Sequence, residues 1–503
     1  MDIPLKSPRN TFSRRLKRQL LTLAALFALV LGIGALPVVV LYFFAHNGEE
    51  KTEAAEKNAY AETSPAGQSR AKPGNPISLN DRAVAFVNVN VVPIDKERII
   101  VGQTVIVKAG CIAEIGPANI TTPPEGALIV DGRGRYLMPG LSDMHVHFRG
   151  GEDENNAFLQ LFIANGVTTV LNLYGTPQHL NLREKVAAGE LLGPIIYSSG
   201  PFVNEPAYKT AEDVERAVIE QKRAGYDFIK IHGDLSREAY HHLLEVSRRE
   251  AIPVVGHAPR KLGMEVLLEE RQLAIAHAEE YLYAYFGFNR KYPDDPDEIK
   301  NLVQQISTAT AKAETWVIPT LTIYRGIGLQ VDDIDAMLAR PEVKYMPPRI
   351  GRGWLPANND YLRRFGKDSV PMFRSRYELL EKLVKGLSDA NVKMVAGTDA
   401  PVPTVVPGFS LHDELKDMVA AGLTPYQAIR TATANAAEFL GVLDIAGTVS
   451  IGKRADLILV EGNPLEDVAN TSRLAGVMVR GRWIAKDELR DILEGLLASY
   501  AGR

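Results

Sequence analysis

The chain of 503 residues contains a single cysteine, Cys111. One cysteine cannot form an intrachain disulfide, and it cannot build a zinc site that needs two or more thiolates. Any metal site must therefore use His, Asp, Glu or a modified Lys side chain. The chain also lacks an excess of positive charge, because its formal net charge is -4. The composition gives no reason to expect nucleic acid as a partner.

One segment lacks charged residues altogether. Residues 20–44, LLTLAALFALVLGIGALPVVVLYFF, contain no Asp, Glu, Lys or Arg, and about 20 apolar residues suffice to span a lipid bilayer. The run is too long for the apolar core of a cleaved signal peptide. Basic side chains precede it and acidic ones dominate after it. We therefore expect a single-pass membrane protein with residues 1–19 in the cytoplasm and the remaining chain on the extracytoplasmic (periplasmic or extracellular) side. Residues 45–76, rich in Glu, Ala, Lys and Ser, are expected to form a flexible linker.

The middle of the chain, residues 137–442, alternates apolar runs with helix-like segments. Eight runs can be read: LSDMHVHF, VTTVLNLYG, PIIYSSG, YDFIKIHGD, IPVVGHA, LAIAHAEE, WVIPTLTIY and VKMVAGTDA. This alternation favours an α/β fold, a (β/α)8 barrel of the TIM type. Short β-like runs with glycine turns lie on either side, in residues 77–136 and 443–488, and we expect them to pair into a small β-sandwich. Residues 489–503 are expected to form a C-terminal helix.

Polar side chains at the carboxyl ends of barrel strands line the active site in such folds. The run LSDMHVHF places His145 and His147 two residues apart, so both imidazoles project from one side of a strand. Two neutral imidazoles directed at one point suit a metal ion; the alternative is that both are ordinary polar residues at a strand end. His257, His277 and Asp399 end three later runs. Each has a structural alternative, a core histidine or a helix N-cap, but their shared position favours one metal site.

Lys230 lies within an apolar run, DFIKIHGD. It shares one face of the expected strand with Phe228 and His232, and we expect this face to point into the barrel. A buried lysine is costly unless it is paired or neutral, and burial favours the neutral amine. A neutral amine can add carbon dioxide and become a carbamate, a carboxylate able to bridge two cations. The alternative is that Lys230 reaches out of the barrel to a substrate carboxylate.

The motifs PGLSDMHVH, DFIKIH, VVGHA, IAHAEE and AGTDA, together with the segment from Ser410 to Leu465, resemble the amidohydrolase superfamily. Because of the lysine in DFIKI, the chain is similar to the imidazolonepropionase-related branch that includes Xaa-Pro dipeptidases. The resemblance covers residues 80–488. It implies two divalent metal ions, with zinc as the default. The implied ligands are His145, His147 and Asp399 for one ion, His257 and His277 for the other, and carboxylated Lys230 as the bridge.

The resemblance implies a membrane-anchored hydrolase of carbon–nitrogen bonds, an amidohydrolase or dipeptidase that attacks small peptides or acylated amino acids with metal-activated hydroxide. Asp399 would move a proton, and Lys230 would hold the metals. Two alternatives stay open. The same fold could serve a lactonase, an esterase or a cyclic-amide hydrolase, or the chain could be a non-catalytic surface binding protein.

Substrate contacts are expected in the loops that follow the strands. Tyr281 follows the sixth run, and Tyr324 and Arg325 are expected to end the seventh; all three are candidates to bind the substrate. Residues 326–372 are expected to form a long loop, a lid or binding loop. The sequence is compatible with an oligomer.

Overall fold

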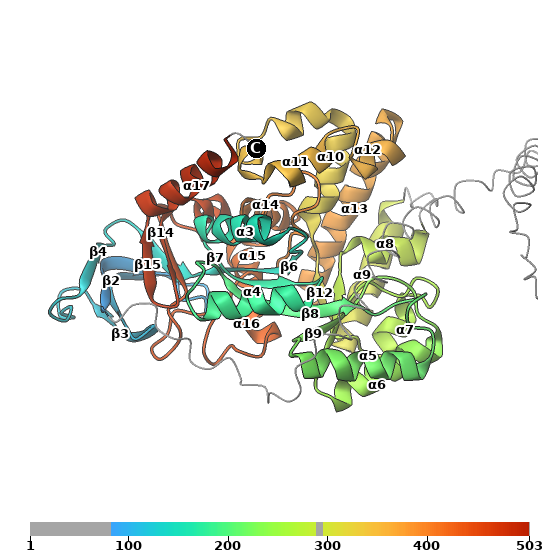
Figure 1. Ribbon diagram of the computed structural model, residues 1–503, viewed down its shortest axis with the longest axis horizontal. Helices are drawn as coiled ribbons and strands as arrows, with labels where there is room; N and C mark the ends of the chain where they lie inside the picture. Colours follow the sequence, from blue (N-terminus) through green and yellow to red (C-terminus); the bar gives the residue numbers. More distant parts are fainter. Residues whose placement is uncertain (1–81, 288–294, 502–503) are drawn as a thin grey trace, which may run out of the picture. The chain divides into compact units, whose positions relative to one another are not determined.

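The computed structural model describes residues 82–287 and 295–501 (Figure 1). At its centre seven parallel strands follow one another in the order β12-β11-β10-β9-β8-β7-β6. Their side chains are almost all buried, as expected for the apolar runs of a parallel sheet covered on both faces. In chain order the strands are β6 (Leu141–Val146), β7 (Val167–Asn172), β8 (Ile195–Phe202), β9 (Phe228–Ile231), β10 (Val254–Gly256), β11 (Ala274–Ala276) and β12 (Trp316–Ile318).

The eighth apolar run, residues 392–400, lies between the two edge strands of this sheet. Parallel bridges join it to β12 and to β6 through the pairs Val317–Met394 and Val146–Ala400. The backbone N–H of Asp399 also donates to the carbonyl oxygen of His145 at 2.7 Å. The run nearly closes the barrel without forming a regular strand. The TIM-like architecture predicted from the sequence is therefore confirmed.

The helix α5 (Ala211–Ala224) illustrates how the sequence sets the helices of the barrel. The hydroxyl of Thr210 accepts a hydrogen bond from the N–H of Asp213 at 3.2 Å and so caps the first turn. Gly225 ends the helix with φ of 91°, a conformation that favours glycine. The buried side chains recur at helical spacing, at Val214, Ala217, Val218 and Gln221.

The other helices that connect the barrel strands, or follow the eighth run, lie around the outside of the strands (Figure 1). Their amphipathic faces pack on the strands, and the buried side chains of strands and helices form shared clusters. The helices are α3 (Glu152–Ala164), α4 (Pro177–Ala187), α6 (Arg237–Arg249), α7 (Met264–Glu269), α8 (Glu279–Phe286), α9 (Pro296–Ala313), α13 (Val370–Asp389), α14 (Phe409–Ala420), α15 (Pro425–Thr431) and α16 (Ala434–Phe439).

A second sheet combines both ends of the described chain. Its order is β15-β14-β13-β5-β1-β2-β3, with β4 also paired to β1. β5 and β13 join the two pieces in antiparallel register, with Met138 opposite Ile458. We expected a β-sandwich; the structure has one sheet that branches at β1. The strands are β1 (Val84–Val91), β2 (Ile100–Lys108), β3 (Cys111–Pro117), β4 (Leu128–Asp131), β5 (Tyr136–Pro139), β13 (Leu457–Val460), β14 (Leu474–Val479) and β15 (Arg482–Ala485).

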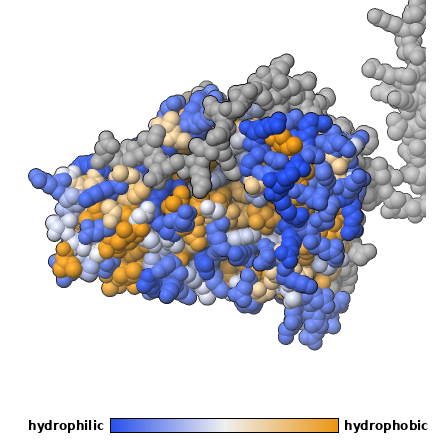
Figure 2. Space-filling view, turned by 90° about the horizontal axis from the view of Figure 1, so that it is seen from below, coloured by the Kyte–Doolittle hydropathy of each residue, from blue (hydrophilic) through white to orange (hydrophobic). Residues whose placement is uncertain are grey.

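This second sheet has a core of its own, separate from the core of the barrel. Phe86 and Trp483, from its two halves, meet edge to face with ring centroids 5.1 Å apart. Hydrophobic side chains also reach the surface of the molecule among hydrophilic ones (Figure 2). Val101 and Ile129 of this sheet are among the large apolar side chains that are more than half exposed.

The predicted long loop at residues 326–372 is wrong. Helices fill this insertion between β12 and the eighth run, because apolar residues recur every fourth position at Ile323, Ile327 and Val331 and are buried. The loop prediction overlooked this spacing. The elements are α10 (Leu321–Leu338), the short 3-10 turns η1 (Val343–Tyr345) and η2 (Lys367–Ser369), α11 (Pro348–Trp354) and α12 (Asp360–Arg364).

The predicted cytoplasmic tail, membrane span and linker, residues 1–76, lie outside the described residues. Within residues 82–287 and 295–501, no helix has the length and apolar character needed to cross a bilayer. The C-terminal helix α17 (Lys486–Tyr500) begins three residues before the predicted boundary. A 3-10 turn, η3 (Val468–Ser472), precedes β14.

Candidate metal centre

The side chains of His145, His147 and Asp399 meet at the carboxyl end of β6. Nε2 of His147 lies 2.7 Å from Oδ1 of Asp399, and Nε2 of His145 lies 3.3 Å from the same oxygen. The backbone of Asp399 has φ of 62°, in the left-handed region that residues with a side chain rarely adopt. Such strain is common at functional sites. The hydrogen bond from its N–H to β6 holds the carboxylate in this position.

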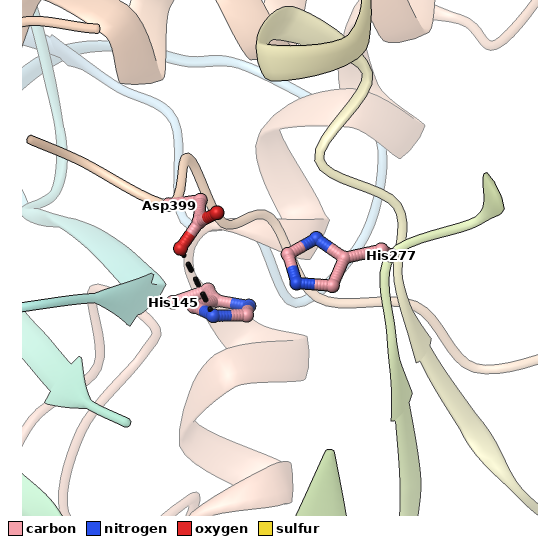
Figure 3. A group of neighbouring side chains, drawn as sticks. All are labelled: His145, His277 and Asp399. Carbon is pink, nitrogen blue, oxygen red and sulfur yellow. Dashed lines mark ion pairs between the residues drawn. The ribbon is translucent and has the colours of Figure 1, made fainter. Parts of the chain in front are cut away.

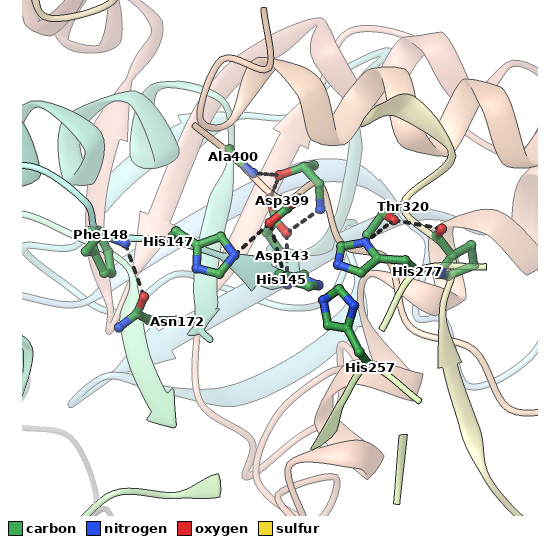
Figure 4. A network of polar contacts seen from close by, with 12 residues as sticks. Asp143, His145, His147, Phe148, Asn172, His257, His277, Thr320, Asp399 and Ala400 are labelled. Atoms are coloured by element: carbon green, nitrogen blue, oxygen red, sulfur yellow. Dashed lines mark hydrogen bonds and ion pairs between the residues drawn. The ribbon is translucent and has the colours of Figure 1, made fainter. Parts of the chain in front are cut away.

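His277 and His257 complete a group of four buried or nearly buried imidazoles. One ligand atom from each of His145, His277 and Asp399 lies within 4.8 Å of the other two (Figure 3). The ring centroids of His145 and His277 are 4.6 Å apart, and those of His257 and His277 are 4.9 Å apart. Figure 4 shows the rings converging from different strands. We call His145, His147, Lys230, His257, His277 and Asp399 together the ligand cluster.

Hydrogen bonds fix which nitrogen of His277 and His257 faces the centre. The hydroxyl of Thr320 donates to the carbonyl of Pro319 at 2.8 Å, so it accepts from Nδ1 of His277 at 2.9 Å. A carboxylate oxygen of Glu280 accepts from Nδ1 of His257 at 2.9 Å. In both rings Nδ1 carries the proton and Nε2 keeps its lone pair. Metal-binding histidines are commonly oriented in this way.

Lys230 lies on β9 with its side chain fully buried. Its Nζ has no hydrogen-bond partner within the described residues. Burial lowers the pKa of Lys230 to about 8, against the opposing charges of Asp399 and Glu280. Burial, and next the charge of Lys230, lowers the pKa of His257. A buried amine without a partner is rare, and a bound ligand or a modification would complete it.

The cluster fits divalent cations. Burial lowers the pKa of His147 to about 4 and that of His277 to about 3, so both rings are neutral at pH 7 and can offer a lone pair. In the described chain, both ring nitrogens of His145 and Nδ1 of His147 lack a hydrogen-bond partner. Imidazole and carboxylate together are the donors that zinc and similar cations prefer. The residues present therefore suit a metal centre.

Asp143 supports the cluster and was not predicted. Its Oδ1 accepts from the backbone N–H of Thr398 at 3.0 Å and of His145 at 3.2 Å, and its Oδ2 accepts from the Thr398 hydroxyl at 2.7 Å. Burial raises the pKa of Asp143 to about 7. These bonds tie β6 to the loop that carries Asp399 (Figure 4). The signal in the sequence was the alternation of Asp143, His145 and His147 on one strand face.

Two adjacent glutamates at the start of α8 have different surroundings. Oε1 of Glu280 pairs with His257 and lies 3.3 Å from the guanidinium of Arg260. Oε2 of Glu279 is buried and has no hydrogen-bond partner within the described residues. Burial, and next the charge of Glu280, raises the pKa of Glu279 to about 8; a cation held nearby would lower it. The motif IAHAEE contained both residues but did not reveal which one reaches His257.

Three residues, Tyr281, Tyr324 and Arg325, were predicted to bind the substrate. Tyr281 and Arg325 contact residues outside the ligand cluster, and Tyr324 and Arg325 lie on a helix. The hydroxyl of Tyr281 is 2.9 Å from that of Thr310. Tyr324 and Arg325 belong to α10, because β12 ends before them, so the prediction that they end a barrel strand is wrong. Nε of Arg325 donates to Asp417 at 3.0 Å. Arg325 is thus committed to an ion pair between α10 and α14.

Comparison with known proteins agrees with this geometry. The sequence profile of the Amidohydrolase family matches residues 136–484, which include the barrel and the whole ligand cluster. The chain belongs to the amidohydrolase family. Family membership confirms the predicted superfamily and the prediction of a hydrolase that acts on carbon–nitrogen bonds.

Individual relatives of this amidohydrolase are distant. Enamidase of Eubacterium barkeri is 24% identical over 386 residues, which cover 74% of this chain and 85% of the enamidase. Ochratoxinase of Aspergillus niger is 23% identical over 389 residues, 66% of this chain and 71% of that protein. Bottromycin amidohydrolase has a TM-score of 0.69 at 22% identity and covers 88% of this chain and 96% of its own. A Xaa-Pro dipeptidase has a TM-score of 0.61 at 19% identity, and the match covers 80% of this chain and 100% of the dipeptidase. At such identities the solved structures establish a shared fold.

Proposed function

We propose that the protein is a metal-dependent amidohydrolase that cleaves an amide bond in small peptides or acylated amino acids. The observation that carries the proposal is the meeting of four imidazoles with the carboxylate of Asp399, together with the buried amine of Lys230, which has no hydrogen-bond partner within the described residues. The names of similar proteins, an enamidase, a Xaa-Pro dipeptidase and a bottromycin amidohydrolase, support hydrolysis of a carbon–nitrogen bond.

The proposed centre holds two cations, with zinc as the default. The amine of Lys230 would add carbon dioxide, release a proton and become a carbamate. A carbamate would put a carboxylate where the buried amine now lacks a partner. In this proposal His145, His147 and Asp399 would hold one cation, His257 and His277 would hold the other, and the carbamate of Lys230 would contribute to both.

Cations bound there supply Lewis acidity, which lowers the pKa of water and polarises the substrate carbonyl. The carboxylate of Asp399 takes a proton from the attacking water and delivers it to the leaving nitrogen. The amide then separates into a carboxylic acid and an amine. Thr320 and Glu280 hold the rings of His277 and His257 before the substrate arrives, so these donors need little reorganisation during the reaction.

We further propose that residues 20–44 anchor this enzyme in a membrane, with the barrel on the extracytoplasmic side. The support is the uncharged run of 25 residues, the basic segment before it and the acidic balance after it. Full-length chain should remain in the membrane pellet after alkaline extraction, whereas residues 77–503 alone should be soluble. A reporter fused after residue 503 that is active only in the cytoplasm would reverse the proposed topology.

Metal analysis combined with a substrate panel tests the catalytic proposal. The full chain, loaded with zinc and bicarbonate, should bind two metal ions and hydrolyse dipeptides or N-acylated amino acids. Asp399→Ala should remove nearly all turnover while the fold remains intact, and Glu265→Gln, an exposed acidic residue on α7, should not. Cleavage of lactones or esters alone would contradict the bond assignment. Absence of both metal and turnover would favour a non-catalytic binding protein.

A further inference from the structure

We propose that Glu279 and Arg149 recognise the two charged ends of the substrate, its ammonium group and its carboxylate, and so select free dipeptides. This inference rests on the proposed function and narrows it. N-acylated amino acids have no ammonium group, and peptide amides have no terminal carboxylate. Each of the two residues lies two positions beyond a member of the ligand cluster, His277 and His147.

Glu279 offers a carboxylate oxygen that nothing in the described chain satisfies. The residue begins α8, and its Oε2 is buried without a hydrogen-bond partner. Oε2 of Glu280 is likewise buried without a partner within the described residues, but its Oε1 is hydrogen-bonded to His257 and orients that ring. A substrate ammonium group is a donor that fits this oxygen and carries the opposite charge.

Arg149 offers a guanidinium group without an ion pair within residues 82–287 and 295–501. Its side chain is exposed, and its Cζ lies 5.5 Å from the ring centroid of Tyr174, where the aromatic face supports the cation. A row of rings leads from there to the ligand cluster, with successive centroids 4.8, 4.6 and 4.8 Å apart: Tyr174, Phe202, His232 and His257. The planar edge of the guanidinium stays available for a carboxylate.

The two charged residues follow strands on different sides of the barrel. β6, which precedes Arg149, and β11, which precedes Glu279, are separated by four strands on one side and by β12 and the eighth run on the other. Opposite charges that follow different sides of the barrel match the two ends of a zwitterion. A substrate with only one charged end would leave one of the two groups without a partner.

The insertion after β12 packs on the barrel through α12. Tyr361 of α12 is half-buried and packs against the core cluster that includes the barrel strands.

Buried amides hold the segment that carries Tyr361. Nδ2 of the fully buried Asn359 donates to Oε1 of Gln330 at 2.8 Å, and Nε2 of Gln330 donates to the carbonyl of Pro403 at 3.0 Å. The N–H of Tyr361 donates to Oδ1 of Asn359 at 3.0 Å. α12 is therefore connected to α10 and to the loop after Asp399. These hydrogen bonds fix the position of the backbone at Tyr361.

The test compares matched substrates on the full-length, metal-loaded enzyme. The panel holds Ala-Xaa dipeptides, the N-acetyl form of each and the C-terminal amide of each. We expect kcat/KM for the free dipeptides to exceed that for both blocked forms by about 100-fold, as for loss of one charged hydrogen bond. Equal cleavage of the N-acetyl forms would overturn this inference but leave the proposed function standing. Absence of amide hydrolysis across the panel would overturn the proposed function itself.

Two variants assign the preference to the two residues. Glu279→Gln should reduce kcat/KM for free dipeptides by about 100-fold and leave the slow cleavage of N-acetyl forms unchanged. Arg149→Gln should do the same for free dipeptides and leave the amide forms unchanged. Both variants should keep the metal content of the wild type, and the matched surface variants Glu265→Gln and Arg216→Gln should behave as wild type. Loss of a metal ion in Glu279→Gln, or a uniform loss on all three substrate forms, would contradict the selective roles.

Discussion

Buried histidines in two regions of the molecule have opposite surroundings. His412 lies where α14 meets α3 and η3, and both of its ring nitrogens are engaged: Nε2 is 3.0 Å from the carbonyl of Asn165, and Nδ1 is 2.9 Å from the hydroxyl of Thr471. In the ligand cluster, neither ring nitrogen of His145 has a hydrogen-bond partner within the described residues, and Nε2 has only the carboxylate of Asp399 at 3.3 Å. The two side chains are almost equally buried, at 4% and 0% exposure.

The difference separates polar groups that stabilise the fold from polar groups that need a ligand. A buried polar atom with a partner contributes modestly to stability, whereas one without a partner costs about 1–3 kcal/mol. The mouth of the barrel, the end where the carboxyl ends of its strands lie, therefore bears a cost that bound cations would offset. The junction at His412 bears none.

The largest loss of turnover is expected for Lys230→Met. Removal of the bridging group should lower turnover by about 1,000-fold or more. The metal-free variant should nevertheless be more stable than metal-free wild type by about 1–3 kcal/mol, because an unpartnered amine is replaced by an apolar side chain of similar volume. Substrate hydrolysis and denaturant unfolding check the two parts. Wild-type turnover in this variant would contradict the assigned role, and Lys382→Met on the exposed surface of α13 is the control.

Metal removal should have the next largest effect. A chelator should abolish turnover and lower the melting temperature, because cations at about 1,000 times their Kd stabilise the folded state by about 4 kcal/mol. Added zinc with bicarbonate should restore both properties. Lys230→Met should gain less stability from zinc than the wild type does. Identical melting temperatures with and without chelator would argue against any resident metal.

Glu280→Gln should weaken metal binding without removing a ligand. Its carboxylate fixes the proton of His257 on Nδ1, and loss of such a partner commonly costs 10- to 100-fold in metal affinity, or about 1–3 kcal/mol. Turnover should fall at limiting zinc and recover when zinc is in excess. Titration of the metal-free variant with zinc measures this shift. An unchanged zinc affinity would mean that the contact has no orienting role.

The smallest effect on activity is expected for His412→Gln. Turnover and metal content should match the wild type, while the free energy of unfolding should fall by about 1–3 kcal/mol through loss of the two hydrogen bonds. Chemical denaturation and metal analysis check both points. A variant with reduced metal content would show that the two groups of histidines are not independent.

The same variant should change how stability depends on pH. Burial lowers the pKa of His412 to about 4 from 6.5. Between these values the unfolded chain binds a proton that the folded chain does not, so wild-type stability falls as the pH drops from 6.5 to 4, by up to about 3 kcal/mol from this group. His412→Gln should flatten the profile by that amount. An unchanged slope across this window would contradict the neutral, hydrogen-bonded state of His412.

Much of the ligand cluster could be predicted because strand geometry is local. The alternation of His145 and His147, and the position of Lys230 between two apolar neighbours, already determine the direction of these side chains once the strands are placed. The topology of a barrel then brings strand ends together that are far apart in the sequence. Asp399 was predicted by the same rule, that polar residues at strand ends meet at the mouth of the barrel. Its run forms only isolated β-bridges to the neighbouring strands.

Other features depend on tertiary contacts that no local pattern encodes. The link between Glu280 and His257 depends on where α8 begins. Oε2 of the adjacent Glu279 has no hydrogen-bond partner within the described residues. The helices of the insertion were not predicted, because the segment was interpreted as a loop in spite of its helical apolar spacing. Arg325 could not be assigned to its ion pair with Asp417 before α10 and α14 were placed together.

Anomalous diffraction from crystals of the zinc-loaded enzyme would locate the proposed cations. We expect two zinc peaks, one beside His145, His147 and Asp399 and one beside His257 and His277, with density for a carboxyl group on Nζ of Lys230. A single peak, or an unmodified lysine beside two well-occupied peaks, would contradict the bridged centre. No zinc at these side chains would contradict the catalytic proposal as a whole.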